Sequence, residues 1–122
     1  MISKLLIVSI AMVSSIAHSQ PMKDWNDIDK KLFIASEVVI LADWNQTLQA
    51  ARNPNRYAEN NLILGRHPSI GYVNSYFAGA LVANYFVADY FSNYRTQYLG
   101  TVIAAELIVV GKNRAIGLKI GF

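Results

Sequence analysis

The sequence predicts an all-α fold, a small three-helix transmembrane bundle preceded by a signal peptide. Three observations predict it: a low content of charged residues, an N-terminal apolar run as long as an export signal, and three longer apolar segments separated by prolines and polar clusters. Charged residues make up 16% of the 122 residues, whereas globular domains carry roughly 25%. This deficit indicates that part of the surface does not face water.

The charge pattern and the residue counts exclude several classes of function. The net charge is +3, but the basic residues alternate with acidic ones or lie at the ends of apolar segments, without the basic stripe typical of nucleic-acid-binding proteins. The sequence has no cysteine, and beyond residue 19 its only histidine is His67. It contains neither a glycine-rich phosphate loop nor a paired-histidine metal motif. We therefore expect no enzymatic activity, no cofactor, no metal and no nucleic-acid partner.

Residues 1–19 are predicted to be a cleaved signal peptide. Lys4 supplies the positive start, the run from 5 to 16 is apolar, and Ala17 and Ser19 are the small residues that a signal peptidase requires. The alternative is an uncleaved transmembrane helix, but the run is shorter than the roughly 20 residues that span a bilayer. Either interpretation directs the chain to the envelope and leaves residues 20–122 as a single helical membrane domain.

The first helix is predicted over about 28–52. Asp27 and Asp29 suit a first helical turn, and the segment 53–55 (Asn-Pro-Asn) is a helix stop. Three polar residues fall within about 40° of one another on a helical projection: Ser36, Asp43 and Thr47. The helix should therefore present one polar face on an otherwise apolar cylinder.

The second helix is predicted over about 69–91. It follows Pro68, contains no Lys, Arg or Glu, and is long enough to span a bilayer. Small residues recur at every fourth position: Gly71, Ser75, Gly79 and Ala83. Such a stripe allows a neighbouring helix to approach closely in a membrane. A soluble core helix that tolerates small residues is the alternative interpretation.

The third helix is predicted over about 96–114, and the short connection before it makes the second and third helices an antiparallel hairpin. Glu106 lies in the middle of its apolar run. Asn113, seven residues later, returns to the same face two turns on.

The candidate site is a set of polar groups at membrane depth. An unpaired charge there costs at least about 2.5 to 3.5 kcal/mol, so buried carboxylates should point inward and be paired or protonated. We expect Asp43 and Glu106 to face each other across the bundle, and the connection between the first two helices to bring polar residues near the helix ends. The predicted site comprises Asp43, Thr47, Glu59, His67, Asn74, Glu106 and Asn113. It is either a proton, ion or small-ligand site or a hydrogen-bonded network that specifies helix register.

Three short motifs stand out: Asp-Trp-Asn-Gln-Thr at 43–47, Leu-Gly-Arg-His-Pro-Ser at 64–69 and Val-Asn-Ser-Tyr-Phe at 73–77. Together with Tyr57, Glu59, Glu106 and Asn113 they give the chain a pattern that resembles a family of small membrane proteins encoded by bacteriophages and prophages of Gram-negative bacteria. The sequence departs from the family in lacking a proline after Glu59. The resemblance covers nearly the whole mature chain and implies an integral membrane protein, without implying a reaction.

The expected function is that of a small, multi-pass protein of the bacterial inner membrane, phage- or prophage-encoded, that acts through helix–helix and protein contacts. Its expected partners are the lipid bilayer and either a second copy of the chain or another envelope membrane protein. Two alternatives stay open. One is a proton- or cation-binding channel or transporter accessory that uses the buried carboxylates, and the other is a holin-like lysis factor.

Overall fold

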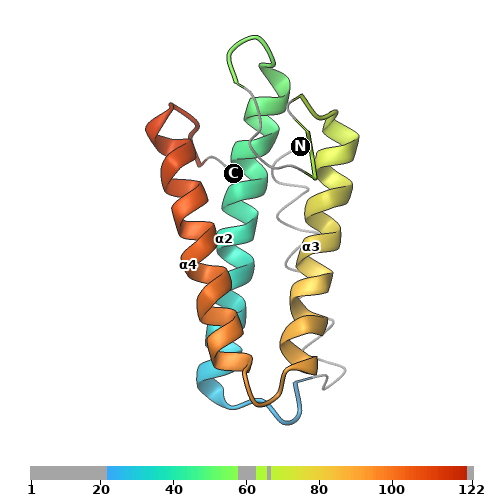
Figure 1. Cartoon of the computed structure of the whole chain (residues 1–122), viewed down its shortest axis with the longest axis vertical. Coiled ribbons are helices and arrows are strands. Elements are labelled where there is room, and N and C mark those ends of the chain that lie inside the picture. The colour runs from blue at the N-terminus through green and yellow to red at the C-terminus, as the bar shows by residue number, and fades with distance from the viewer. Residues whose placement is uncertain (1–21, 58–62, 66, 121–122) are drawn as a thin grey trace.

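The computed structural model describes residues 22–57, 63–65 and 67–120, and within them it contains three helices. These are α2 (Asp27–Arg52), α3 (Ile70–Tyr90) and α4 (Arg95–Ala115), shown in Figure 1. The predicted all-α, three-helix fold is confirmed, and each helix begins and ends within one residue of its predicted range. The predicted signal peptide, residues 1–19, lies outside the described residues.

Local sequence explains where the first two helices begin. The Asn26 side chain accepts a hydrogen bond from the backbone N–H of Asp29 at 2.7 Å and caps α2. Ser69 caps α3 in the same way, because its Oγ accepts from the N–H of Tyr72 at 3.1 Å. Each cap satisfies a backbone donor that has no partner within the helix. Local capping residues therefore account for the starts of α2 and α3.

The central helix is α2, which packs against α3 on one side and α4 on the other, whereas α3 and α4 have little direct contact with each other (Figure 1). The chain runs along α2, returns along α3 and runs forward again along α4, so α2 and α4 are parallel. As predicted, α3 and α4 are antiparallel and joined by a short turn. Because α3 and α4 contact each other little, both helices of this hairpin are held in place mainly by packing against α2.

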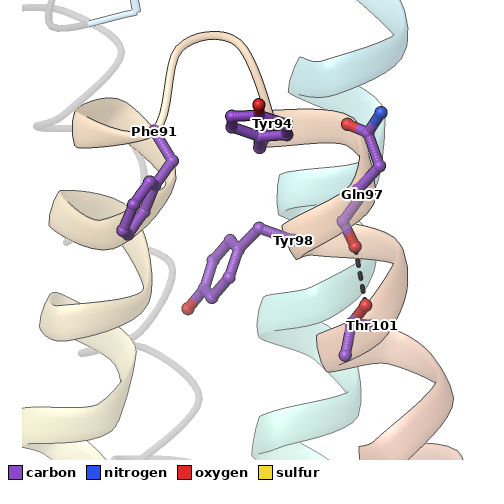
Figure 2. A pocket seen from close by; sticks show the side chains of 5 residues that line it. All are labelled: Phe91, Tyr94, Gln97, Tyr98 and Thr101. Atoms are coloured by element: carbon purple, nitrogen blue, oxygen red, sulfur yellow. Dashed lines mark hydrogen bonds between the residues drawn. The ribbon is translucent and has the colours of Figure 1, made fainter.

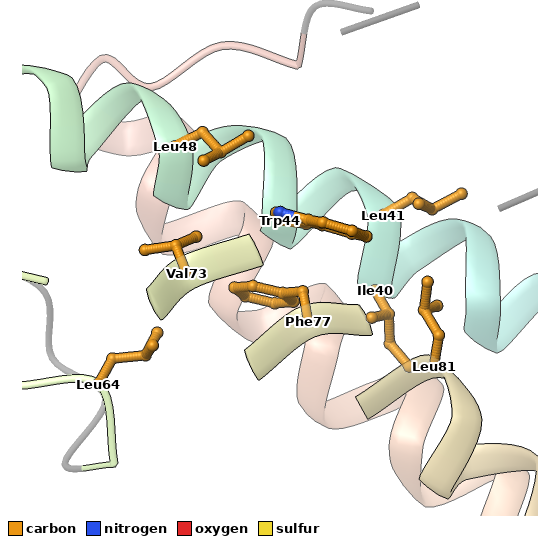
Figure 3. Packing of buried hydrophobic residues seen from close by; sticks show 8 residues of the cluster. All are labelled: Ile40, Leu41, Trp44, Leu48, Leu64, Val73, Phe77 and Leu81. Carbon is orange, nitrogen blue, oxygen red and sulfur yellow. The ribbon is translucent and has the colours of Figure 1, made fainter. Parts of the chain in front are cut away.

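Most of the apolar interior belongs to the α2–α3 contact (Figure 3). The rings of Trp44 and Phe77 stack at a centroid distance of 5.9 Å and an interplanar angle of 11°. Around them lie Ile40, Leu41, Leu48, Val73 and Leu81, all buried. Leu64, from the connection before α3, closes one end of this cluster and is 6% exposed. The connection therefore packs onto the bundle through Leu64.

A second cluster fastens the segment before α2 to the α3–α4 turn. Trp25 stacks on Tyr85 and donates its indole N–H to Asp89 Oδ1 at 3.0 Å. The Arg95 guanidinium lies 4.6 Å from the Trp25 ring centroid and donates to the carbonyl oxygens of Ala88, at 2.8 Å, and Asp89, at 3.1 Å. Arg95 thus satisfies carbonyls at the end of α3 with a positive charge, which the helix dipole favours there.

Among the described residues, no helix combines the length and the apolar character needed to cross a membrane. Charged residues lower the hydropathy of α2 and α4, and asparagine and tyrosine lower that of α3. The structure thus confirms three helices but not the membrane spans that the sequence predicted for them.

The predicted packing stripe on α3 is not covered by another helix of the described residues. All four of its residues are exposed, namely Gly71, Ser75, Gly79 and Ala83. A Cβ atom added at either glycine would meet no atom within 4 Å. Val73, Phe77 and Leu81 face α2 instead, because these larger side chains remove more apolar surface from water. Among the described residues the small residues therefore face outward, and the helix contact expected along them stays a prediction.

Candidate functional site: a polar seam between α2 and α4

The contact between α2 and α4 is lined by polar side chains, and we call it the polar seam. On α2 the buried polar residues are Asp29, Ser36, Glu37, Asn45, Gln46 and Thr47. Polar groups removed from water must find hydrogen-bond partners inside the protein. The identity of those partners determines what the seam can do.

The two ends of the seam set the register of the helices. Near the start of α2, Asp29 Oδ1 accepts a hydrogen bond from the Thr96 hydroxyl at 2.6 Å. Near its end, the Gln46 amide donates to the carbonyl oxygen of Val110 and accepts from the Asn113 amide, each at 3.2 Å. The paired residues are 67, 64 and 67 positions apart in sequence. A nearly constant separation is what two parallel helices in one register produce.

The carboxyl groups of Asp43 and Glu106 meet in the middle of the seam, where they are hydrogen-bonded to each other. Asp43 Oδ1 also accepts a hydrogen bond from the Thr47 hydroxyl at 3.2 Å. Because ionised carboxylates only accept hydrogen bonds, the contact between the two acids requires a proton on one of them. The sequence-based expectation that Asp43 and Glu106 face each other across the bundle agrees with this contact.

The environment of the pair favours that proton. Burial, and after it the hydrogen bond and the charge of neighbouring Asp43, raise the pKa of Glu106 to about 8. Burial also raises the pKa of Asp43, although its hydrogen bonds from Glu106 and Thr47 act in the opposite direction. Glu106 is therefore the group that carries the shared proton near neutral pH, and Asp43 is the acceptor.

A third buried carboxyl group, Glu37 of α2, lies at the contact with α3 and is only 5% exposed. Burial raises its pKa to about 8, against a smaller lowering by the Asn84 amide, which donates to Glu37 Oε2 at 3.5 Å. The same amide donates to Ser36 Oγ at 2.8 Å, and its oxygen accepts from the Tyr98 hydroxyl at 2.9 Å. Asn84 thus joins all three helices at one point.

Sequence reasoning missed Glu37 because it lies off the polar stripe of Ser36, Asp43 and Thr47. The sequence around Glu37 could have indicated its burial. Ala35 and Ser36 precede it and two valines follow it, so it is the only charged residue in this short stretch. A carboxylate within an apolar stretch of helix requires a partner or a proton, whichever face it occupies.

The remaining predicted site residues are separated from the carboxyl pair. Asn74 accepts the indole N–H of Trp44 at 2.9 Å and so belongs to the apolar cluster between α2 and α3. His67 is exposed in the connection before α3. Glu59 lies outside the described residues. The predicted site is thus divided: Asp43, Thr47, Glu106 and Asn113 lie in the seam, whereas Asn74 and His67 do not.

A pocket of about 410 Å³ opens beside the α3–α4 turn (Figure 2). It is lined by Phe91, Tyr94, Gln97, Tyr98 and Thr101. Tyr98 extends from α4 toward α3, where its hydroxyl reaches Asn84. One wall of the pocket is therefore formed by Tyr98, which also donates a hydrogen bond to Asn84, the partner of Glu37.

The seam is suited to holding and releasing protons. Within the part of the chain that the structure describes, no group of three or more His, Cys, Asp or Glu residues is placed to hold a metal ion. The described residues thus form a three-helix bundle whose buried carboxyl groups have pKa values raised by burial. Comparison of the chain with family models, with curated proteins and with solved structures finds no match.

Proposed function

We propose that this is a small protein of the bacterial envelope that acts through helix–helix contacts made by the outer face of α3. That face is defined by Gly71, Ser75, Gly79, Val82, Ala83 and Phe86, which follow one another at helical spacing and are all exposed. The observation that carries the proposal is that none of these residues is charged, although Phe86 is 61% exposed. Uncharged apolar faces of this kind mark interaction sites.

The shape of the outer face favours another helix as its partner. Added Cβ atoms at Gly71 and Gly79 meet nothing within 4 Å, so a partner backbone can approach closely at these positions. Val82 and Phe86 would contribute apolar area at one end of the contact, at about 25 cal/mol per Å² removed from water. A second copy of the chain can supply a matching face, because a two-fold symmetric contact pairs the same surface on both subunits.

The absence of cysteine provides a direct test of this contact. A full-length Ser75→Cys chain should form disulfide-linked dimers in cells, and a further Gly79→Leu change should abolish them because the leucine blocks close approach. Gly111→Leu is the matched control, since Gly111 is also an exposed helical glycine with nothing within 4 Å. If Gly79→Leu and Gly111→Leu have equal effects, the outer face of α3 is not the contact surface.

Association with the inner membrane is part of the same proposal. It is supported by the signal-like residues 1–19 and by the resemblance to membrane proteins of phages and prophages. Fractionation of cells that express the full chain tests it, because the protein should sediment with inner-membrane vesicles and resist extraction by salt. Recovery in the supernatant would contradict association with the inner membrane, and the dimer test of the outer face of α3 would stand independently of this result.

The carboxyl pair supports a second candidate function, that of a proton- or cation-binding accessory to a channel or transporter. The observation in its favour is the hydrogen bond between Asp43 and Glu106 at the centre of the bundle. For this function Asp43→Asn should abolish the membrane phenotype while Gly79→Leu only weakens it, and the opposite order is expected for the contact function.

A further inference from the structure

We propose that a proton shared between Asp43 and Glu106 holds α4 against α2, and that loss of this proton releases α4 while α2 and α3 stay packed. The proposed device is a pH-sensitive joint within the fold. It depends on the carboxyl pair and is independent of the outer face of α3, so either proposal can fail without the other.

The first argument is the hydrogen bonding of Glu106. Its Oε2 atom is fully buried, and no donor of the described residues reaches it. A buried oxygen without a donor is costly, whereas a proton held between the two acids provides the missing hydrogen bond. The closed arrangement of α2 and α4 is therefore the arrangement of the protonated pair.

The second argument is that α4 is the helix with the weaker apolar attachment. The cluster around Trp44 consists of buried residues from α2, α3 and Leu64, and α4 adds only the partly buried Val102. Its main fully buried apolar anchor is Leu99, in the cluster near the α3–α4 turn. Repulsion within the seam would consequently separate α4 from α2 before it disturbs the stacking of Trp44 on Phe77.

The third argument is the sign of the charges that would develop. In the described part of the chain, the pKa values of the pair are shifted by burial, by the two acids themselves and by Thr47. Glu37 from α2 and Tyr98 from α4 lie around the neutral amide of Asn84 from α3. Arg95, at the end of the seam, is engaged by carbonyl oxygens and the Trp25 ring. The pair consists of two acids, and loss of the shared proton leaves two negative charges in contact.

The expected pH range follows from the environment of the pair. Burial and the neighbouring Asp43 raise the pKa of Glu106 to about 8. A carboxyl group with a raised pKa in the folded state stabilises the fold at low pH, and this contribution is lost as the pH rises through the raised value. The joint should accordingly be closed in acid and neutral solution and open in alkaline solution.

The test measures the distance between α2 and α4 with spin labels, in a chain that has no cysteine of its own. Val38→Cys with Ala104→Cys places labels on exposed positions of α2 and α4, and Val38→Cys with Val82→Cys provides the α2–α3 reference. Between about pH 5 and about pH 10, the α2–α4 distance distribution should broaden and shift to longer values. The α2–α3 distribution should stay unchanged.

Variants of the pair identify the proton responsible. Glu106→Gln should keep α4 closed at both pH values, because the neutral amide still donates to Asp43, and Asp43→Asn should likewise remove the response. Glu37→Gln is the matched control and should retain it. A constant α2–α4 distance in the parent chain, a normal response in Glu106→Gln, or loss of the response in Glu37→Gln would each overturn the proposal.

A second measurement does not depend on the folding of any pair variant. The infrared carbonyl band of protonated carboxyl groups in the unlabelled full chain should weaken over the same pH range in which the α2–α4 distance increases. A band that disappears well below the pH of opening would overturn the proposal, because the shared proton would then be gone while the joint was still closed.

Discussion

The side-chain amide of Asn113 donates a hydrogen bond to Gln46 Oε1 at 3.2 Å and joins the later halves of two parallel helices. Gln46 is completely buried and uses its other end to donate to the carbonyl oxygen of Val110. A buried amide satisfied at both ends permits one register of α2 against α4, since a shift by one residue would leave both groups without partners. This register is what brings Asp43 opposite Glu106.

Folding stability should decrease as the pH rises from about 4.5 to about 8. Glu37 has an ordinary pKa of 4.5 and a folded-state pKa of about 8, so the folded chain binds its proton more tightly than the unfolded chain. The stability contributed is complete below the ordinary value and lost by the folded-state value. Urea midpoints measured across this range check the sign. Glu37→Gln should reduce the dependence of the urea midpoint on pH, whereas the control Asp24→Asn, at an exposed position, should leave it unchanged.

Trp44→Ala should destabilise the protein by about 3 to 5 kcal/mol, because it removes the ring that stacks on Phe77 and leaves a cavity in the main cluster. Trp44→Phe keeps an aromatic ring but leaves Asn74 without its donor, and should cost only about 1 kcal/mol. Chemical denaturation of both variants measures the two losses in the free energy of unfolding, which should differ severalfold. Equal losses would show that the hydrogen bond, and not ring packing, dominates at this position.

Arg95→Ala should destabilise the protein by about 2 kcal/mol or more, because two carbonyl oxygens at the end of α3 lose a charged donor and Trp25 loses its cation contact. Amide hydrogen exchange should accelerate in the last turn of α3 and in the segment around Trp25. Arg114→Ala, at an exposed position in the last turn of α4, is the control and should leave both regions protected. Unchanged exchange in Arg95→Ala would exclude this fastening role.

Gly65→Ala should destabilise the connection before α3 by about 1 to 2 kcal/mol. Gly65 has a φ of +80°, a conformation that residues with a Cβ atom rarely adopt. The same substitution at Gly111, within α4 and with open space around it, should stabilise the chain by about 0.5 to 1 kcal/mol through helix propensity. Thermal melting distinguishes the two, and a loss of stability at both positions would contradict this account of Gly65.

Part of the candidate site could be predicted from one helix at a time. Asp43 and Thr47 are four residues apart and so share a helix face, as the hydrogen bond between them shows. Glu106 could be selected because it stands alone in an apolar run. The partners of Asn74 and Asn84 could not be predicted, because each depends on which face of α3 is turned toward α2.

The small residues of α3 also show that the pattern of a single helix does not predict which of its faces is buried. Their four-residue spacing was evident in the sequence, but spacing alone does not decide whether a stripe faces inward or outward. Val73 and Phe77 compete for the same contact with α2 and bury more apolar area. The stripe of Gly71 and Gly79 consequently remains on the outside.

For the described residues, the sequence by itself determined which segments form helices and about where each one begins and ends, because caps, prolines and polar interruptions act over a few residues within the chain. Only the tertiary structure decided that α2 lies in the centre, that α4 runs parallel to it, and that Glu37 is buried against Asn84 of α3. These features arise from competition among whole helix faces for burial and for hydrogen-bond partners. That competition joins residues more than 60 positions apart, and no local pattern encodes its result.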